Sequence, residues 1–333
     1  MGFFSTPISR HFKMRLNFSL RKSLSLSLLL LTLLMLLAFF IGPLFPADPA
    51  QRFSFISRLP DPSQNSLVPI IAGAEEISYP AQGTSSSLKK FSFAYLHGFS
   101  ASRQEISPVA EDIAKYFAAP AFFVRLAGHG IHDQGESLGQ AQCLDWLKDS
   151  DRAVTQASIP GRDLVIIATS FGGLLASFAA LEHPDQIKAL VLISPLFDTA
   201  DPRAKWLSGP LGPFWARLLI GTTREYPTQN EMQRRLSTYH YPSRVIPQLM
   251  DCVNFIRQAD LSKIKIPLLV FYTEKDRVVS VAEIKKRFAE FGSSKKKLVE
   301  VAQASQHVLT GQMIEPTTIP FVEDQIEKFL ETL

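Results

Sequence analysis

Short apolar runs alternate with amphipathic stretches over most of the chain after residue 90. A strand that is buried on both faces reads as a continuous apolar run, so the runs predict strands and the stretches between them predict helices. This alternation is typical of a doubly wound, mostly parallel α/β sheet. The predicted strands are residues 91–96, 122–126, 164–167, 189–193, 267–272 and 297–301, and the predicted helices are residues 108–117, 138–157, 174–181 and 319–333.

One interval interrupts the alternation. Residues 197–264 are rich in aromatic residues and proline, and they show helical patterning near residues 214–220 and 245–256. A loop of that length without structure is uncommon in a compact domain. We therefore predict a helical cap over the strand ends, the alternative being a segment that covers one edge of the sheet.

The first fifty residues differ in composition from the rest. Five Lys and Arg residues precede an uncharged run, residues 23–47, which is dominated by Leu and Phe. A helix of about 20 apolar residues spans the hydrocarbon core of a membrane, so this run predicts a single-pass transmembrane anchor, with a cleaved signal segment as the alternative. Basic residues on its N-terminal side predict that this end stays in the cytoplasm and that the rest lies outside, in the periplasm or at the cell surface.

Four segments follow from this division. They are a cytoplasmic basic segment (1–22), the anchor or signal segment (23–47), a stalk and domain entry (48–88) and the α/β domain (89–333). The stalk contains an expected edge strand near residues 77–79.

Charge and cysteine content exclude several classes of partner. The formal net charge is +4, but the surplus lies in the first fifty residues and the remainder is neutral. Nucleic-acid binding needs a basic face, so we expect no nucleic-acid partner. Cys143 and Cys252 fit no metal spacing and favour two small buried residues, although a single disulfide stays open outside the cytosol. We expect no metal and no organic cofactor, and the sequence identifies no protein partner.

The candidate chemistry is centred on Ser170. The apolar run ends in Ala168-Thr-Ser170-Phe-Gly172, and a helical run follows at once. A serine on so sharp a turn has a strained backbone, which only small neighbours two positions away permit, here Ala168 and Gly172. The next helix points its N–H groups at any oxyanion formed there. The pattern predicts a nucleophile for acyl transfer, the alternative being an ordinary glycine-rich turn.

A nucleophilic serine needs a base, and the base needs an orienting acid. Of the seven histidines, His307 follows the last predicted strand, at a carboxyl end from which a loop can reach Ser170. His307 is the predicted base. Asp276 directly follows the strand at residues 267–272 and is the predicted acid, with Asp198 as the second candidate. The order Ser, Asp, His favours Asp276.

These segments together resemble the α/β-hydrolase-fold serine hydrolases of the bacterial carboxylesterase and monoacylglycerol-lipase type. The resemblance covers about residues 91–330 and is carried by Leu96-His-Gly-Phe99, Gly128-His-Gly130, Ala168-Thr-Ser170-Phe-Gly172-Gly173, Asp276-Arg-Val-Val and His307. It implies that Phe99 and Phe171 donate the two backbone N–H groups of an oxyanion hole, which a tetrahedral oxyanion requires.

The chain departs from the family pattern at three points. Ala168 and Thr273 stand where Gly is common, and both changes are sterically mild. A clear pair of leading antiparallel strands is missing, which predicts a trimmed sheet. His97 is expected to hold its loop by hydrogen bonding.

Together with the predicted anchor, the resemblance implies a membrane-anchored serine esterase or lipase that cleaves uncharged, lipid-like esters through an acyl-enzyme. Thioesterase and acyltransferase action use the same triad and stay open, as does a catalytically silent, membrane-tethered binding domain. We expect three aromatic residues of the insertion to line an apolar acyl pocket, namely Trp206, Phe214 and Trp215.

Overall fold

The computed structural model describes residues 69–81 and 90–333, together with Thr32. The chain divides into two units, Met1–Ser54 and Phe55–Leu333, and the sheet belongs to the second. No helix among the described residues is long and apolar enough to cross a membrane. The predicted anchor, residues 23–47, lies outside the described residues apart from Thr32, as do the basic segment and much of the stalk.

A seven-stranded sheet forms the centre of the second unit, in the order β1-β3-β2-β4-β5-β8-β9. β1 pairs antiparallel with β3 and the other neighbours are parallel, so the predicted mostly parallel sheet is confirmed. Among the described residues β1 is the only antiparallel strand of this sheet, and the trimming of its leading strands stays a prediction. The strands are β1 (Ile77–Tyr79), β2 (Phe91–Leu96), β3 (Ala121–Phe123), β4 (Asp163–Thr169), β5 (Ile187–Ile193), β8 (Leu268–Tyr272) and β9 (Lys296–Glu300).

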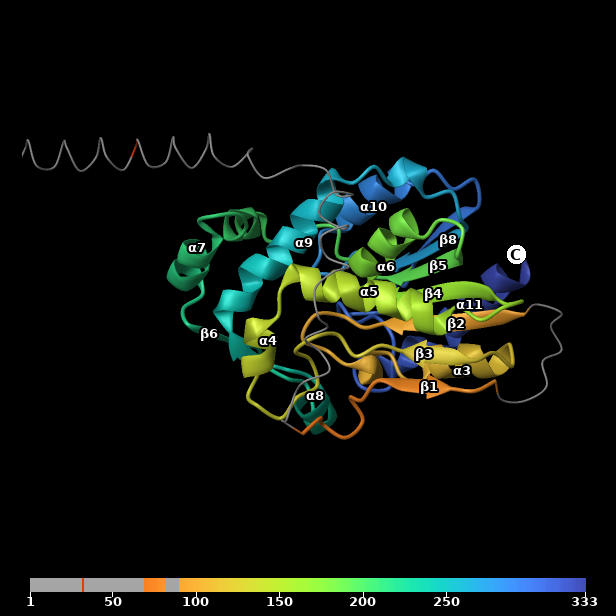
Figure 1. The fold of residues 1–333 in the computed structure, drawn as a ribbon, viewed down its shortest axis with the longest axis horizontal. Helices are drawn as coiled ribbons and strands as arrows, with labels where there is room; N and C mark the ends of the chain where they lie inside the picture. Colours follow the sequence, from red (N-terminus) through yellow and green to blue (C-terminus); the bar gives the residue numbers. More distant parts are fainter. Residues whose placement is uncertain (1–31, 33–68, 82–89) are drawn as a thin grey trace, which may run out of the picture. The chain divides into compact units, whose positions relative to one another are not determined.

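Helices cover both faces of the sheet (Figure 1). α3 (Val109–Tyr116) and α11 (Ile319–Glu331) pack their apolar side chains against alternate strand residues on one face. α5 (Cys143–Ala157) and α6 (Phe171–Glu182) pack against each other and against β2 and β4, and α10 (Val281–Glu290) follows β8. Because both faces are covered, β2, β5 and β8 are apolar and buried at almost every position.

Two predicted elements differ from the structure. The predicted helix at residues 138–157 is divided into α4 (Glu136–Gln140) and α5, because Gln142 forms a capping box with Asp145 and starts a new helix. The predicted strand at residues 122–126 ends at β3, since the Leu126 N–H donates to His97 Nε2 at 3.2 Å and leaves the sheet ladder.

The interval between β5 and β8 folds into short helices and a two-stranded sheet, which Figure 1 shows at one end of the main sheet. Its elements are α7 (Gly212–Leu219), β6 (Thr223–Glu225), α8 (Glu231–Leu236), β7 (His240–Pro242) and α9 (Ile246–Gln258). β6 and β7 are antiparallel, and we call the whole interval the cap.

The disulfide that the sequence left open is present, so the favoured interpretation of Cys143 and Cys252 as two unpaired buried residues is wrong. Cys143 at the start of α5 and Cys252 in α9 form a disulfide across 109 residues of sequence. Their distance along the chain hid the pairing, because only the tertiary fold brings α9 beside α5. The bond fixes the last helix of the cap to the body of the domain.

Candidate active site

Ser170 lies on a sharp turn between β4 and α6, at the carboxyl end of the central strands. Its φ is +52°, a region that residues other than Gly rarely adopt. Two backbone hydrogen bonds hold it there, from the Ser170 N–H to the Ile193 carbonyl at 2.8 Å and from the Leu196 N–H to the Ser170 carbonyl at 2.9 Å. Gly172 is needed because a Cβ there would stand 2.0 Å from the Leu96 carbonyl oxygen. The sequence pattern at the elbow therefore reflects a steric requirement.

Ser170, His307 and Asp276 form one hydrogen-bonded relay. Nε2 of His307 lies 2.8 Å from Oγ of Ser170, and Nδ1 lies 2.7 Å from Oδ2 of Asp276. An ionised carboxylate can only accept, so Nδ1 carries the imidazole hydrogen and Nε2 is left to accept the serine proton. The structure thus brings together the three residues that the sequence proposed for a triad.

Asp276 is 5% exposed, and both oxygens of its carboxylate accept hydrogen bonds. Oδ1 accepts hydrogen bonds from the N–H groups of Val278 and Val279 at 2.8 and 3.0 Å. Burial raises the pKa of Asp276, but the hydrogen bond from His307 and these backbone hydrogen bonds lower it by more. The pKa of Asp276 therefore lies below its usual value. The carboxylate is therefore ionised while it orients the imidazole.

The second acid candidate is engaged elsewhere. Asp198 accepts from the Thr199 N–H at 2.9 Å, and its other oxygen lies 3.6 Å from Nε of Arg257. His183 pairs with Asp151 at 2.7 Å, at the far end of α6. The structure therefore places Asp276, and not Asp198, against His307.

The two predicted oxyanion donors come from the loop after β2, at Phe99, and from the start of α6, at Phe171. Residues 98–102, which we call the oxyanion loop, follow β2. In this loop the Gly98 N–H donates to the Glu105 carboxyl, and the Ser100 N–H donates to His129 Nε2 at 2.9 Å. Among the described residues the Phe99 N–H, which lies between these two groups, has no hydrogen-bond acceptor. Phe171 is the first residue of α6, where N–H groups have no partner within the helix. Both donors are thus available to a ligand.

Aromatic rings hold Phe99 in place. Its ring makes edge contacts, with ring centres 5.5 to 6.1 Å apart, to the rings of His129, Trp146, Phe171 and Tyr241. These come from the loop after β3, from α5, from α6 and from the cap. In addition, the N–H of Thr238 in the cap donates to the Ser100 carbonyl at 2.8 Å. The oxyanion loop is therefore fixed by four separate parts of the fold.

His97 holds a loop, as expected. Its ring is buried, with Nδ1 2.9 Å from the Gly98 carbonyl and Nε2 accepting from the Leu126 N–H. Burial lowers the pKa of His97 to about 4, although the Gly98 carbonyl raises it in part. A neutral imidazole is the form that can both donate and accept, so the ring joins the ends of β2 and β3.

Sequence reasoning missed Glu105 and Tyr95. Both are 2% exposed, and the Tyr95 hydroxyl donates to Glu105 Oε1 at 2.8 Å. Glu105 stands in a polar stretch of no recognisable pattern, and only tertiary burial sets it apart. The sequence therefore carried no signal that could have identified this pair.

The three aromatic residues predicted to line an acyl pocket cluster together on the cap. Trp206 and Phe214 are 52% and 59% exposed, and Trp215 is half-buried with its ring centre 5.7 Å from Trp206 and 5.2 Å from Phe214. Rings exposed to this degree do not enclose a cavity. Their role in substrate binding stays a prediction.

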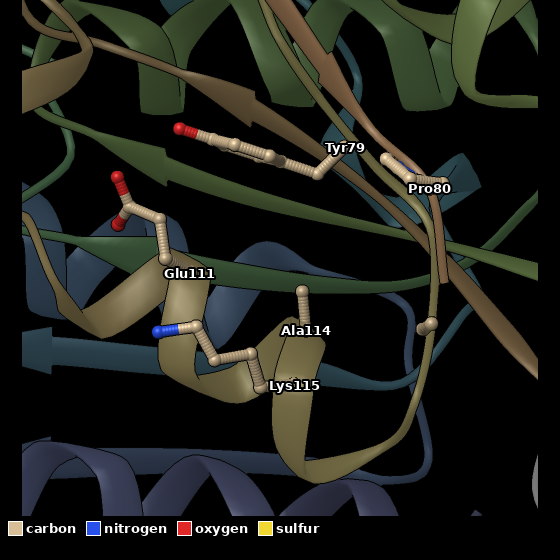
Figure 2. Close-up of a pocket in the computed structure, with 6 residues that line it drawn as sticks. Tyr79, Pro80, Glu111, Ala114 and Lys115 are labelled. Carbon is tan, nitrogen blue, oxygen red and sulfur yellow. The ribbon is translucent and has the colours of Figure 1, made fainter. Parts of the chain in front are cut away.

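A small cavity of about 140 Å³ lies elsewhere, between β1 and α3. Figure 2 shows its lining, in which Tyr79, Glu111 and Lys115 supply the polar groups. None of the relay residues lines this cavity, so it is not the site of the relay. In the described part of the chain no three His, Cys, Asp or Glu side chains are grouped closely enough to hold a metal ion.

Comparison with known proteins identifies the family. Residues 90–311 match the family model described as serine aminopeptidase, S33 (Hydrolase_4). The chain belongs to this family. A thermostable monoacylglycerol lipase of Bacillus sp. (strain H-257) is 26% identical over 253 residues, which is 75% of this chain and 93% of the relative.

Two further matches agree on the class. A pimeloyl-[acyl-carrier protein] methyl ester esterase of Neisseria meningitidis serogroup A is 26% identical over 205 residues, covering 55% of this chain and 61% of the relative. The solved structure of a metagenome-derived lipolytic enzyme superposes with a TM-score of 0.64 at 20% identity, over 79% of this chain and all of that chain. The prediction of an α/β-hydrolase-fold serine hydrolase of the carboxylic ester hydrolase class is confirmed.

The geometry predicts which acid matters. Replacing Asp276 by Asn should lower kcat for ester hydrolysis by about 10⁴-fold, because an amide at this position favours the wrong imidazole tautomer. Asp198→Asn loses only a partly exposed ion pair, so its kcat should stay close to wild type. Steady-state kinetics of both variants check this. A larger loss in Asp198→Asn than in Asp276→Asn would overturn the assignment.

Proposed function

We propose that the protein hydrolyses carboxylic esters of uncharged, lipid-like substrates through an acyl-enzyme on Ser170. The relay from Ser170 through His307 to Asp276, with contacts of 2.8 and 2.7 Å, is the observation that carries the proposal. A serine hydroxyl becomes a nucleophile at neutral pH only when such a base removes its proton.

In the acylation half, Oγ of Ser170 attacks the ester carbonyl carbon while its proton passes to Nε2 of His307. The carbonyl π electrons move to oxygen, and the N–H groups of Phe99 and Phe171 bind the oxyanion. When the oxyanion collapses, the bond to the alcohol oxygen breaks and His307 gives its proton to the leaving alcohol. Asp276 stays ionised and stabilises the imidazolium between these two steps.

In the deacylation half, water takes the place of the alcohol. His307 accepts a proton from the water as its oxygen attacks the acyl carbon, and the same oxyanion site is used again. Collapse breaks the bond to Oγ, and His307 returns the proton to Ser170. The products are a carboxylic acid and the free enzyme.

The net charge of the chain and the names of its relatives support the substrate class. The part of the chain after residue 50 has no net charge to attract ionic substrates. One relative is named for monoacylglycerol and another for a methyl ester on an acyl carrier protein, so the two share an acyl ester bond. Thioester cleavage and acyl transfer use the same relay and are the alternatives, and an inactive binding domain is the alternative of another class.

We also propose that the enzyme is anchored by residues 23–47 with its catalytic domain outside the cytoplasm. The apolar length of that segment and the basic residues before it support the proposal. The Cys143–Cys252 disulfide supports it independently, because disulfides persist in oxidising compartments.

The mechanism is tested by removing the nucleophile and the base. Ser170→Ala should lower kcat by about 10⁴- to 10⁶-fold and abolish labelling by a fluorophosphonate, and His307→Ala should be about as damaging in kcat. His183→Ala is the matched control, because it removes a histidine from a His–Asp pair outside the relay. Wild-type turnover in the Ser170 or His307 variant would exclude the mechanism.

The topology is tested by external protease on intact cells or spheroplasts. Proteolysis should reach the chain after about residue 46, while a cytoplasmic marker protein stays intact. A catalytic domain that is digested only after lysis would refute the proposed location.

Chain-length preference tests the acyl site. Each buried CH₂ contributes up to about 0.8 kcal/mol, so kcat/KM should rise severalfold for every two carbons from acetyl to octanoyl esters until the site is filled. Trp215→Ala should flatten this rise, whereas Phe214→Ala, which removes a more exposed ring, should change it less. A flat series in the wild type would count against an apolar acyl site, and an unchanged series in Trp215→Ala would remove Trp215 from its wall.

A further inference from the structure

A buried carboxyl group next to the relay has no part in the proposed mechanism. Glu105 ends the short helix η3 (Arg103–Glu105), directly after the oxyanion loop, and is 2% exposed. Its Oε1 atom accepts hydrogen bonds from the Gly98 N–H and from the Tyr95 hydroxyl. A buried acid therefore holds the oxyanion loop at the residue just before Phe99.

Tyr95 extends this contact to the strand that carries the nucleophile. Its hydroxyl oxygen lies 3.2 Å from Oγ1 of Thr169, the last residue of β4. Thr169 immediately precedes Ser170, as Gly98 immediately precedes Phe99. Buried side chains thus join the two backbone segments whose spacing sets the distance between the nucleophile and an oxyanion donor.

The space around Gly98 is too small for a side chain. A Cβ on Gly98 would stand 2.9 Å from Oε2 of Glu105 and 3.4 Å from Cβ of Ser170. The loop therefore passes through a narrow gap between the Glu105 carboxyl and the nucleophile. A displacement of the carboxyl would move the Gly98 peptide, and with it the Phe99 N–H.

We propose that Glu105 is a positioning residue, whose carboxyl fixes the Gly98 peptide and so aims the Phe99 N–H at the carbonyl oxygen of the substrate. The inference rests on the proposed function, since it concerns the oxyanion hole of that same site. Glu105 contacts neither the relay nor the substrate in this role, and it acts through Gly98.

The charge of Glu105 gives this role a pH dependence. Burial raises the pKa of Glu105 to about 8, although the hydrogen bonds from Gly98 and Tyr95 lower it in part. The carboxyl is therefore mostly neutral at pH 7 and ionises as the pH rises through about 8. A negative charge behind the oxyanion hole repels the oxyanion that forms there, so kcat falls in the ionised form.

The charged and titratable groups around Glu105 do not offset that charge. Tyr95 from β2 and Tyr226 from the cap face it, and the pKa of each is raised, chiefly by burial. The charge of Glu111 on α3 also raises the pKa of Tyr95. The nearby Arg103 is directed to other acids, with its guanidinium nitrogens 3.6 Å from Glu75 and 3.8 Å from Glu111.

The experiment compares Glu105→Gln and Glu105→Ala with the wild type, in the full chain, for 4-nitrophenyl butyrate hydrolysis between pH 6.5 and 9.5. Glu105→Gln keeps a neutral acceptor for the Gly98 N–H, so it should retain kcat at pH 7 and lose the severalfold alkaline fall of the wild type. Glu105→Ala should lower kcat by about 10- to 100-fold with KM within about threefold, less than the loss of a whole oxyanion donor.

Glu111→Gln is the matched control. Burial also raises the pKa of Glu111, but its carboxyl contacts Ser107 and Arg103 and not the oxyanion loop. This variant should keep both the kcat at pH 7 and the alkaline fall. Fluorophosphonate titration of Ser170 counts the folded active sites in every sample, so that kcat is expressed per active site.

Two results would overturn the inference while leaving the proposed function intact. One is a Glu105→Ala enzyme with wild-type kcat per active site, and the other is a Glu105→Gln enzyme with the same alkaline fall as the wild type. If Glu105→Ala does not fold, the pH profile of Glu105→Gln decides alone. A wild type that neither hydrolyses esters nor reacts with the fluorophosphonate would instead refute the proposed function.

Discussion

The close approach of α6 to the end of β2 is the constraint on which the rest of the site depends. Gly172 lies so near the Leu96 carbonyl that no side chain fits, and Ser170, at the start of the helix, has a strained backbone with a positive φ. The same approach brings the first N–H of α6 beside the loop that leaves β2. One backbone contact therefore positions both the nucleophile and the oxyanion donors. Asp276 and His307 come from the loops after β8 and β9, on the opposite side of β4 from β2.

The sequence revealed those features that depend on neighbours along the chain. The elbow at Ser170 is a local pattern of small residues, and the strands are local apolar runs, so the elbow and the strands other than β3 were predicted with nearly correct bounds. Asp276 and Asp198 both follow strands, and only the fold shows which carboxylate reaches His307. The disulfide and the burial of Glu105 arise from segments far apart in sequence, or from packing alone, and no pattern in the chain encodes them.

The oxyanion loop shows how a catalytic feature can be distributed over a fold. Its conformation depends on His129 after β3, on Trp146 in α5 and on Thr238 and Tyr241 in the cap. Each contact is a single hydrogen bond or ring edge, worth on the order of 1 kcal/mol. Their sum is what keeps a short loop rigid enough to present one N–H in a fixed direction.

The disulfide also limits how this enzyme can be shortened. A variant without the cap would lose Cys252 and leave Cys143 as a free thiol at the first residue of α5. A helix N-terminus favours the thiolate, which is the reactive form of cysteine. A trimmed enzyme would therefore carry a reactive surface group that the intact protein does not have, and it would cross-link with its own copies in air unless Cys143 were replaced as well.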